Sequence, residues 1–118
     1  MLGTMLIFAA APLMLGAASA EQASLADARC LIALTQIPES KDAATAAALQ
    51  SATLYYAGRI DGRAPAVDLK TLFVRAMTDL KPEDLGPTLT RCGELMQQRG
   101  AVYQEIGRAM QAETPAAK

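Results

Sequence analysis

The chain contains no histidine and no tryptophan, and aromatic residues make up only 4% of it. Histidine is the commonest general base and a common ligand of zinc and haem iron, so its absence removes the most frequent catalytic and metal-binding side chain. No CxxC motif occurs, which argues against a thioredoxin-like redox site, and no glycine-rich phosphate loop follows a strand pattern. The sequence therefore predicts a protein without enzymatic activity, without a metal and without a cofactor.

The chain also lacks an excess of positive or negative charge. Eleven basic and twelve acidic residues give a net charge of -1, and neither sign forms a block along the 118 residues. Proteins that bind nucleic acid carry a basic face, so this distribution predicts no nucleic-acid partner. The length suffices for one domain at most.

The first twenty residues, MLGTMLIFAAAPLMLGAASA, contain no charged side chain. Their apolar run ends in Ala18-Ser19-Ala20, the pattern of small residues that signal peptidase cleaves. We expect residues 1–20 to be a signal peptide that is removed after Ala20, which predicts a periplasmic or secreted protein with no membrane attachment. An uncleaved membrane anchor is the alternative, since about 20 apolar residues can span a bilayer.

The chain has two cysteines, Cys30 and Cys92. Export to an oxidising compartment favours a disulfide between them over two buried thiols. Such a bridge would close a loop of about 60 residues and stabilise the fold by roughly 4 kcal/mol in the chain-entropy model.

Helical patterns cover the rest of the chain, and no segment has the alternation of a strand. We expect one helical domain at residues 21–113, followed by a disordered tail at residues 114–118. The first helix should begin at a capping box formed by Ser24 and Asp27 and end before Pro38.

The second and third helices are delimited by caps and breakers. The second should run from about Lys41 to Ile60 with Ser40 as its cap, and Gly62 should terminate it in the left-handed conformation. Of its two adjacent tyrosines, Tyr56 should face the core and Tyr55 the surface. The third helix should be capped by Asp68 and end near Lys81.

The fourth helix keeps one heptad register from Leu89 to Met110, which predicts a single helix of about 25 residues. Gly93, Gly100 and Gly107 recur in it every seventh residue. Interior glycine costs a helix about 1 kcal/mol relative to alanine, so we expect a compensating contact. Close packing against the alanine-rich second helix is the first interpretation, and a groove open to a ligand is the second. Together the helices predict an all-α, antiparallel four-helix bundle with one inter-helix disulfide and a long C-terminal helix.

Four charged residues are candidates for binding. Arg59, Asp61 and Arg63 cluster in the segment GRIDGR, which we interpret as a solvated turn or a recognition loop. Arg99 occupies a seam position of the fourth helix that is otherwise apolar. A cation there must extend to solvent, pair with an acid or bind an anion.

The layout resembles two groups of small secreted bacterial proteins. Size, helicity, export and the single pair Cys30 and Cys92 are similar to the HdeA-like acid-stress chaperones of the periplasm. The same features, together with YYAGRIDGR, are similar to the Rap1a/Tai-type immunity proteins, which have an aromatic-x-x-Gly turn before their long helices. That second group has additional cysteines near the turn where this chain has tyrosines. A separate family is the third interpretation, and neither resemblance assigns a role to a residue.

The sequence thus favours a secreted, non-enzymatic domain that binds another protein, whose identity and stoichiometry stay open. The alternative is an acid-activated chaperone. In that case protonation of carboxylates such as Glu94 and Glu105 would expose the apolar seam at low pH.

Overall fold

The structure is a computed structural model that describes the backbone of residues 11–113 and the side chains of residues 19–113. Its helices are α1 (Ala11–Thr35), α2 (Ala43–Arg63), α3 (Leu69–Asp79) and α4 (Leu85–Glu113), with the 3₁₀ turn η1 (Pro82–Asp84) before α4. Residues 11–113 contain no strand. The all-α class and the long last helix are therefore confirmed. The expected tail at 114–118 and the first ten residues of the expected signal peptide lie outside the described residues.

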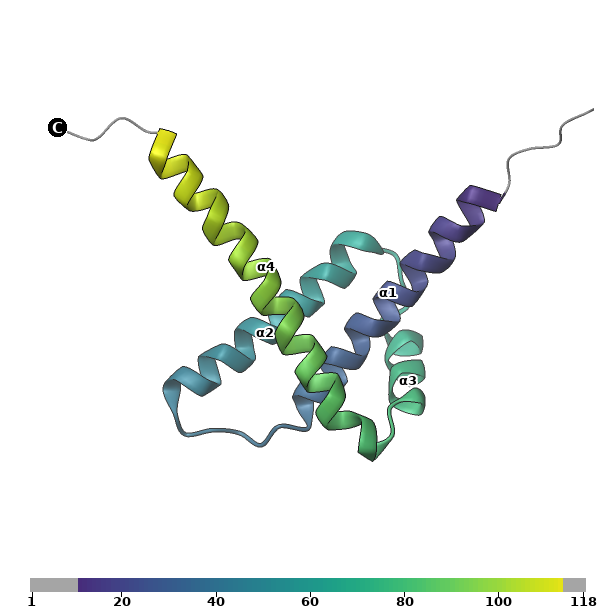
Figure 1. The fold of residues 1–118 in the computed structure, drawn as a ribbon. Coiled ribbons are helices and arrows are strands. Elements are labelled where there is room, and N and C mark those ends of the chain that lie inside the picture. Colours follow the sequence, from purple (N-terminus) through teal and green to yellow (C-terminus); the bar gives the residue numbers. More distant parts are fainter. Residues whose placement is uncertain (1–10, 114–118) are drawn as a thin grey trace, which may run out of the picture.

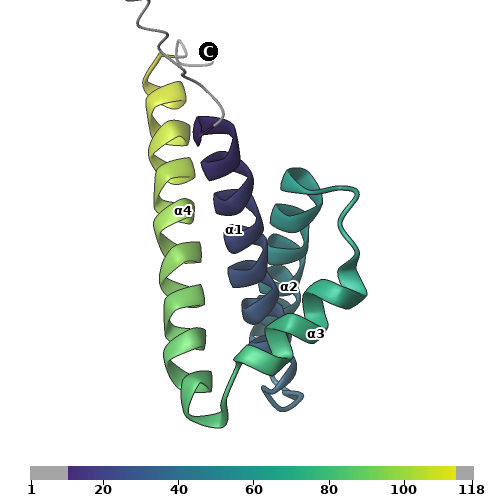
Figure 2. The same cartoon turned by 90° about the vertical axis from the view of Figure 1, so that its right-hand side faces the viewer.

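Helix α1 forms the centre of the molecule. α2, α3 and α4 each pack against α1, and no other pair of these helices forms a comparable interface (Figures 1 and 2). α4 crosses α1 near the chain's last inter-helix loop and then diverges from it (Figure 1). The helices thus pack around α1, and a closed antiparallel bundle is not confirmed.

The core is small and is built where α2, α3 and α4 meet α1. Ala28 is fully buried, and its short side chain lets the neighbouring helices approach α1 closely. Tyr56 of α2 is the largest fully buried side chain, whereas Tyr55 is partly exposed, as expected. The buried cluster consists of Leu25, Ala28, Cys30, Leu31, Tyr56, Ile60, Leu72, Ala76 and Cys92.

The start of α1 differs from the prediction. The helix begins at Ala11 and not at Ser24, and it continues through the expected cleavage site after Ala20. Ser24 and Asp27 lie in its interior and are both 2% exposed, so the predicted capping box is wrong. Alanine is frequent before Ser24 and has the highest helix propensity, which accounts for the longer helix.

An aspartate side chain caps the N-terminus of both α2 and α3. Asp42, and not Ser40, caps α2: its carboxylate accepts a hydrogen bond from the backbone N–H of Thr45 at 2.9 Å. Asp68 caps α3 as predicted and accepts from the N–H of Thr71 at 3.3 Å. These bonds pair backbone N–H groups that the first helical turn leaves without a partner.

The predicted termination of α2 at Gly62 is wrong. α2 continues to Arg63, and the N–H of the capping residue Ala64 still donates to the carbonyl of Ile60. Pro65 follows and cannot continue the helix. The segment GRIDGR is therefore helical throughout and is neither a turn nor a loop.

Helix α4 is unbroken at Gly100, as the heptad register predicts. The predicted close contact between its glycines and α2 is wrong. A Cβ atom placed on Gly93, Gly100 or Gly107 would have no neighbour within 4 Å. The reason is geometric: α4 packs against α1, and its last partly buried residue is Met96.

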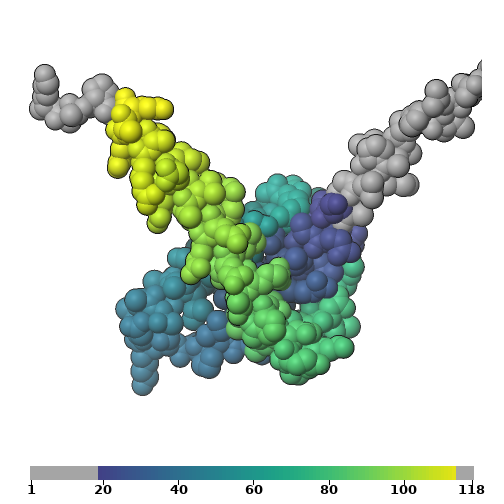
Figure 3. All heavy atoms as spheres, viewed as in Figure 1, coloured from purple at the N-terminus to yellow at the C-terminus, as the bar shows by residue number. Residues whose placement is uncertain are grey.

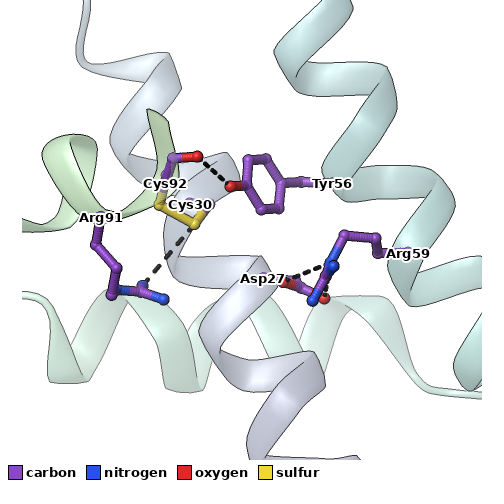
Figure 4. The surroundings of a disulfide bond; sticks show 6 residues. All are labelled: Asp27, Cys30, Tyr56, Arg59, Arg91 and Cys92. Atoms are coloured by element: carbon purple, nitrogen blue, oxygen red, sulfur yellow. Dashed lines mark hydrogen bonds and ion pairs between the residues drawn. A yellow bond between two sulfur atoms is a disulfide. The ribbon is translucent and has the colours of Figure 1, made fainter. Parts of the chain in front are cut away.

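Cys30 and Cys92 form a disulfide with a Cα–Cα distance of 5.9 Å, which confirms the predicted bridge between the first and last helices. Both residues are buried. The bond fastens the inner part of α4 to the C-terminal part of α1 (Figure 4).

Candidate functional site

The most buried charge in the described residues belongs to Asp27 of α1. Its side chain is 3% exposed and accepts hydrogen bonds from two arginines of α2. Nε of Arg59 lies 3.1 Å from both carboxylate oxygens, and Nη1 of Arg63 lies 3.0 Å from Oδ2 (Figure 4 shows Asp27 and Arg59). Arg63 also donates to the hydroxyl of Ser24 at 3.3 Å. One carboxylate thus joins α1 to the last two turns of α2.

Arg59 has further partners on its own helix. It donates to the hydroxyl of Tyr55 at 3.3 Å, and its guanidinium lies 5.6 Å from the centre of that ring. Partial burial lowers the pKa of Arg59, but the hydrogen bonds and charge of Asp27, together with Tyr55, outweigh burial and raise the pKa overall. Arg59 is therefore a fixed cation of the α1–α2 interface.

The three charged residues of GRIDGR have different surroundings. Arg59 and Arg63 are one helical turn apart and both bind Asp27, which no pattern in the sequence indicated. Asp61 is exposed and lines a hollow of about 500 Å³ between α1, α2 and α3. The cluster expected as one recognition loop is therefore split. The arginines join two helices, and the aspartate lies apart from them.

The hollow beside Asp61 is almost entirely apolar. Of the described residues that line it, Asp61 alone is charged. The hydroxyls of Thr35 and Thr53 donate to carbonyls of their own helices at 2.6 and 2.9 Å. The other lining residues are Leu31, Ile32, Ala57, Ile60, Leu69 and Phe73. A ligand in this hollow would find one carboxylate and few other polar atoms, so the hollow offers little to orient a substrate.

The surroundings of the disulfide are tightly packed. The hydroxyl of Tyr56 donates to the backbone carbonyl of Cys92 at 2.5 Å, and Nη2 of Arg91 lies 3.8 Å from Sγ of Cys30 (Figure 4). Burial, followed by the neighbouring Tyr55, raises the pKa of Tyr56 above its ordinary value. This cluster anchors α4 and has no exposed reactive group.

The outer arm of α4, defined here as residues 97–113, is exposed along its entire length. Its tip stands clear of the other helices in the space-filling view (Figure 3). Four large apolar side chains on it remain in contact with solvent. They are Val102, Tyr103, Ile106 and Met110, with exposures of 43, 65, 49 and 63%. We call these four residues the apolar stripe.

Arg99 lies at the inner end of the apolar stripe. Its guanidinium is 5.5 Å from the centre of the Tyr103 ring, a distance at which a cation is attracted to the aromatic face. No carboxylate of the described residues forms an ion pair with Arg99. The sequence left three possibilities for Arg99: extension to solvent, pairing with an acid, or binding an anion. In the structure its side chain extends into solvent.

Neither a metal site nor a membrane-spanning helix is found in the described part of the chain. Its cysteine, aspartate and glutamate side chains form no group of three that could hold a metal ion. Its helices are all too short or too polar to cross a bilayer. No family model, curated protein or solved structure matches the chain. The apolar stripe is therefore assigned as the candidate functional site on geometry alone.

Proposed function

We propose that this chain is an exported, non-enzymatic protein-binding domain and that the apolar stripe of α4 is its binding surface. The observation that carries the proposal is the exposure of Val102, Tyr103, Ile106 and Met110 on one face of a projecting helix. Contiguous apolar surface on a folded chain marks sites of interaction, and an amphipathic helix is a common element of protein recognition.

The anchoring of α4 supports this role. The disulfide at Cys92 and the hydrogen bond from Tyr56 hold the inner part of the helix against α1. The outer arm continues from that fixed part as one helix, so it need not be ordered when a partner binds. Less conformational entropy is then lost on binding.

The distribution of polar groups supports a non-enzymatic role. The most buried carboxylate, Asp27, is fully engaged by Arg59 and Arg63. A general acid or base must be able to reach a substrate and exchange its proton. Asp27 is occupied by structural partners, and the two threonine hydroxyls that share the hollow with Asp61 donate to backbone carbonyls of their own helices.

Periplasmic or secreted localisation is supported by two features. The buried disulfide between Cys30 and Cys92 is typical of oxidising compartments. The uncharged N-terminal segment ends in Ala-Ser-Ala, and cleavage after Ala20 would leave α1 starting near Glu21 with all its core residues.

A pair of matched substitutions tests the proposed surface. Ile106→Glu places a charge in the apolar stripe, whereas Leu54→Glu alters an exposed apolar residue of α2, which is 65% exposed against 49% for Ile106. Both variants should keep the wild-type helical circular dichroism, because neither side chain is in the core. In cross-linking from the native envelope fraction, we expect Ile106→Glu to lose the partner and Leu54→Glu to retain it. Equal retention by both variants would refute the proposal.

A second candidate, the acid-activated chaperone, is favoured by one observation. The ion pairs that join α1 to α2 and α3 all depend on carboxylates, namely Glu21, Asp27 and Asp79. Glu94 and Glu105 are exposed on α4, so their protonation would uncover no core. Loss of the ion pairs between the helices would instead loosen α2 and α3 from α1 and expose the buried cluster between them.

Dye binding separates the two candidates. The apolar stripe is exposed at neutral pH, so a binding domain should give a hydrophobic-dye signal that stays nearly constant down to pH 3. A chaperone should show a steep rise in that signal on acidification and should then suppress aggregation of many clients.

A further inference from the structure

Helix α4 carries a seam whose members alternate in spacing between four and three residues. This is the spacing of the two core positions of a coiled coil. The seam consists of Cys92, Met96, Arg99, Tyr103, Ile106, Met110 and Glu113. Its first two members pack against α1, and the remainder are exposed on the outer arm. The outer arm therefore has the pattern of a helix that pairs with another helix.

Two members of the exposed seam are charged, and their charges are opposite. Arg99 is at the inner end and Glu113 is at the outer end of α4. They are two heptads apart, which places them on one face at a separation of about 21 Å along the axis. The apolar stripe lies between these two charges.

We propose that the apolar stripe binds a second copy of this chain, with the two outer arms packed antiparallel about a two-fold axis close to Tyr103 and Ile106. This inference rests on the proposed protein-binding function and names its partner. In such a pair Tyr103 of each copy packs against Ile106 of the other. Along the helix, Arg99 is then about 8 Å and Glu113 about 13 Å from the axis. Arg99 of each copy therefore lies within one helical turn of Glu113 of the other.

Charge complementarity selects this arrangement over the alternatives. A parallel pair would place Arg99 beside Arg99 and Glu113 beside Glu113, which like-charge repulsion disfavours. The uncharged residues 1–20 of the chain could cover the apolar stripe, but they would leave both seam charges without a partner. An antiparallel second copy supplies the opposite charge at both ends, and a two-fold interface makes each contact twice.

The open glycines are consistent with the same arrangement. Gly100 and Gly107 each follow a seam residue directly, and a Cβ atom at either would meet nothing within 4 Å. A second helix could approach α4 closely beside them, where a larger side chain would hold it off. The contact that the glycines were expected to make with α2 would then be made between copies.

The test is sedimentation equilibrium of the full chain and its charge variants. A standard interface buries roughly 800 Å² per partner, and a single short helical arm provides less, so we expect a weak dimer whose population rises with protein concentration. Arg99→Glu and Glu113→Arg should each weaken the dimer roughly tenfold or more, because each creates like charges across the axis. The double variant R99E/E113R should restore wild-type association.

Arg108→Glu is the matched control. Arg108 lies on the opposite side of α4 from the seam and forms an ion pair with Glu105 of its own helix at 2.8 Å. This variant has the same change in charge as Arg99→Glu, and it should leave the dissociation constant unchanged. Helical circular dichroism of all four variants checks that each one folds.

Three results would overturn the inference. If the chain stayed monomeric at several hundred micromolar while Ile106→Glu still lost another protein, the second copy would be wrong and the binding function would stand. If the chain formed a dimer that none of the charge variants weakened, another surface would hold the copies together. A loss of association in both single variants that the double variant failed to restore would contradict the antiparallel arrangement.

Discussion

Removing the carboxylate of Asp27 should be one of the most destabilising single changes in this chain. Asp27 is 3% exposed, and among the described residues it is the only acceptor that Arg59 and Arg63 share. Asp27→Ala would leave two partly buried guanidinium groups facing each other without an anion. Asp27→Asn would keep the shape and one acceptor oxygen but lose the charge.

The magnitude follows from the burial of the three partners. Removing one member of a buried ion pair costs about 3–5 kcal/mol. The side chains of Arg59 and Arg63 are 30 and 24% exposed, so water can solvate part of each. We therefore expect Asp27→Ala to lower the free energy of unfolding by about 2–4 kcal/mol and Asp27→Asn by somewhat less. Small domains have a total of about 5–15 kcal/mol.

Urea denaturation followed by circular dichroism at helical wavelengths measures this loss. The control is Asp79→Ala, whose pair with Arg29 lies at 3.0 Å but whose carboxylate side chain is 48% exposed. An exposed pair of this kind contributes at most about 1 kcal/mol. If Asp27→Ala destabilised the chain no more than Asp79→Ala, the reasoning that Asp27 holds α2 against α1 would be refuted.

Further predictions concern the disulfide, the glycines and pH. Reducing the Cys30–Cys92 bond, which spans 62 residues, should lower the free energy of unfolding by roughly 4 kcal/mol in urea titrations with and without reductant. Gly100→Ala should raise stability by up to about 1 kcal/mol in the same assay, because the added methyl group meets no neighbour; a marked loss would show that the position is packed within the monomer. The raised pKa of Tyr56 makes the folded state hold the phenol proton more tightly than the unfolded chain, whose pKa is 10.0. The stability that this provides is complete below pH 10 and is lost as the pH rises further, which thermal unfolding at pH 8 to 11 should show in the wild type but not in Tyr56→Phe.

Local signals predicted most of the helical structure. The cap at Asp68 and the uninterrupted heptad register of α4 were both correct. Each depends on residues within a few turns of one another, so tertiary packing had little opportunity to override them. The disulfide was also predictable, because two cysteines in an exported chain allow only one pairing.

The start of α1 could not be read from composition. The alanine-rich end of a signal peptide and the first turns of a stable helix contain the same residues. Ser24 and Asp27 satisfied a capping pattern, although both are buried in the helix interior. Ser24 and Asp27 lie on the same face of the helix as Leu31. That spacing was the one indication in the sequence that both residues are inside the helix and packed against its neighbours.

The extent of α2 was decided by tertiary contacts. Glycine and charged residues in GRIDGR suggested a turn, but the ion pairs of Arg59 and Arg63 with Asp27 hold those last turns in helical form. These partners are more than 30 residues away in sequence, at positions that were assigned to a cap. The candidate site was likewise only partly predictable: the seam and Arg99 were visible, but the distance that α4 extends beyond α1 was not.

Photo-cross-linking at the apolar stripe tests the central claim most directly. A photoreactive amino acid at Ile106, and at Arg108 on the opposite side of α4, would be irradiated in the native envelope fraction, and the adducts would be identified by mass spectrometry. The account predicts a protein adduct from position 106, with the mass of two copies of this chain, and none from position 108. An absence of adducts at position 106, or equal adducts at both positions, would contradict a binding surface on this face of α4.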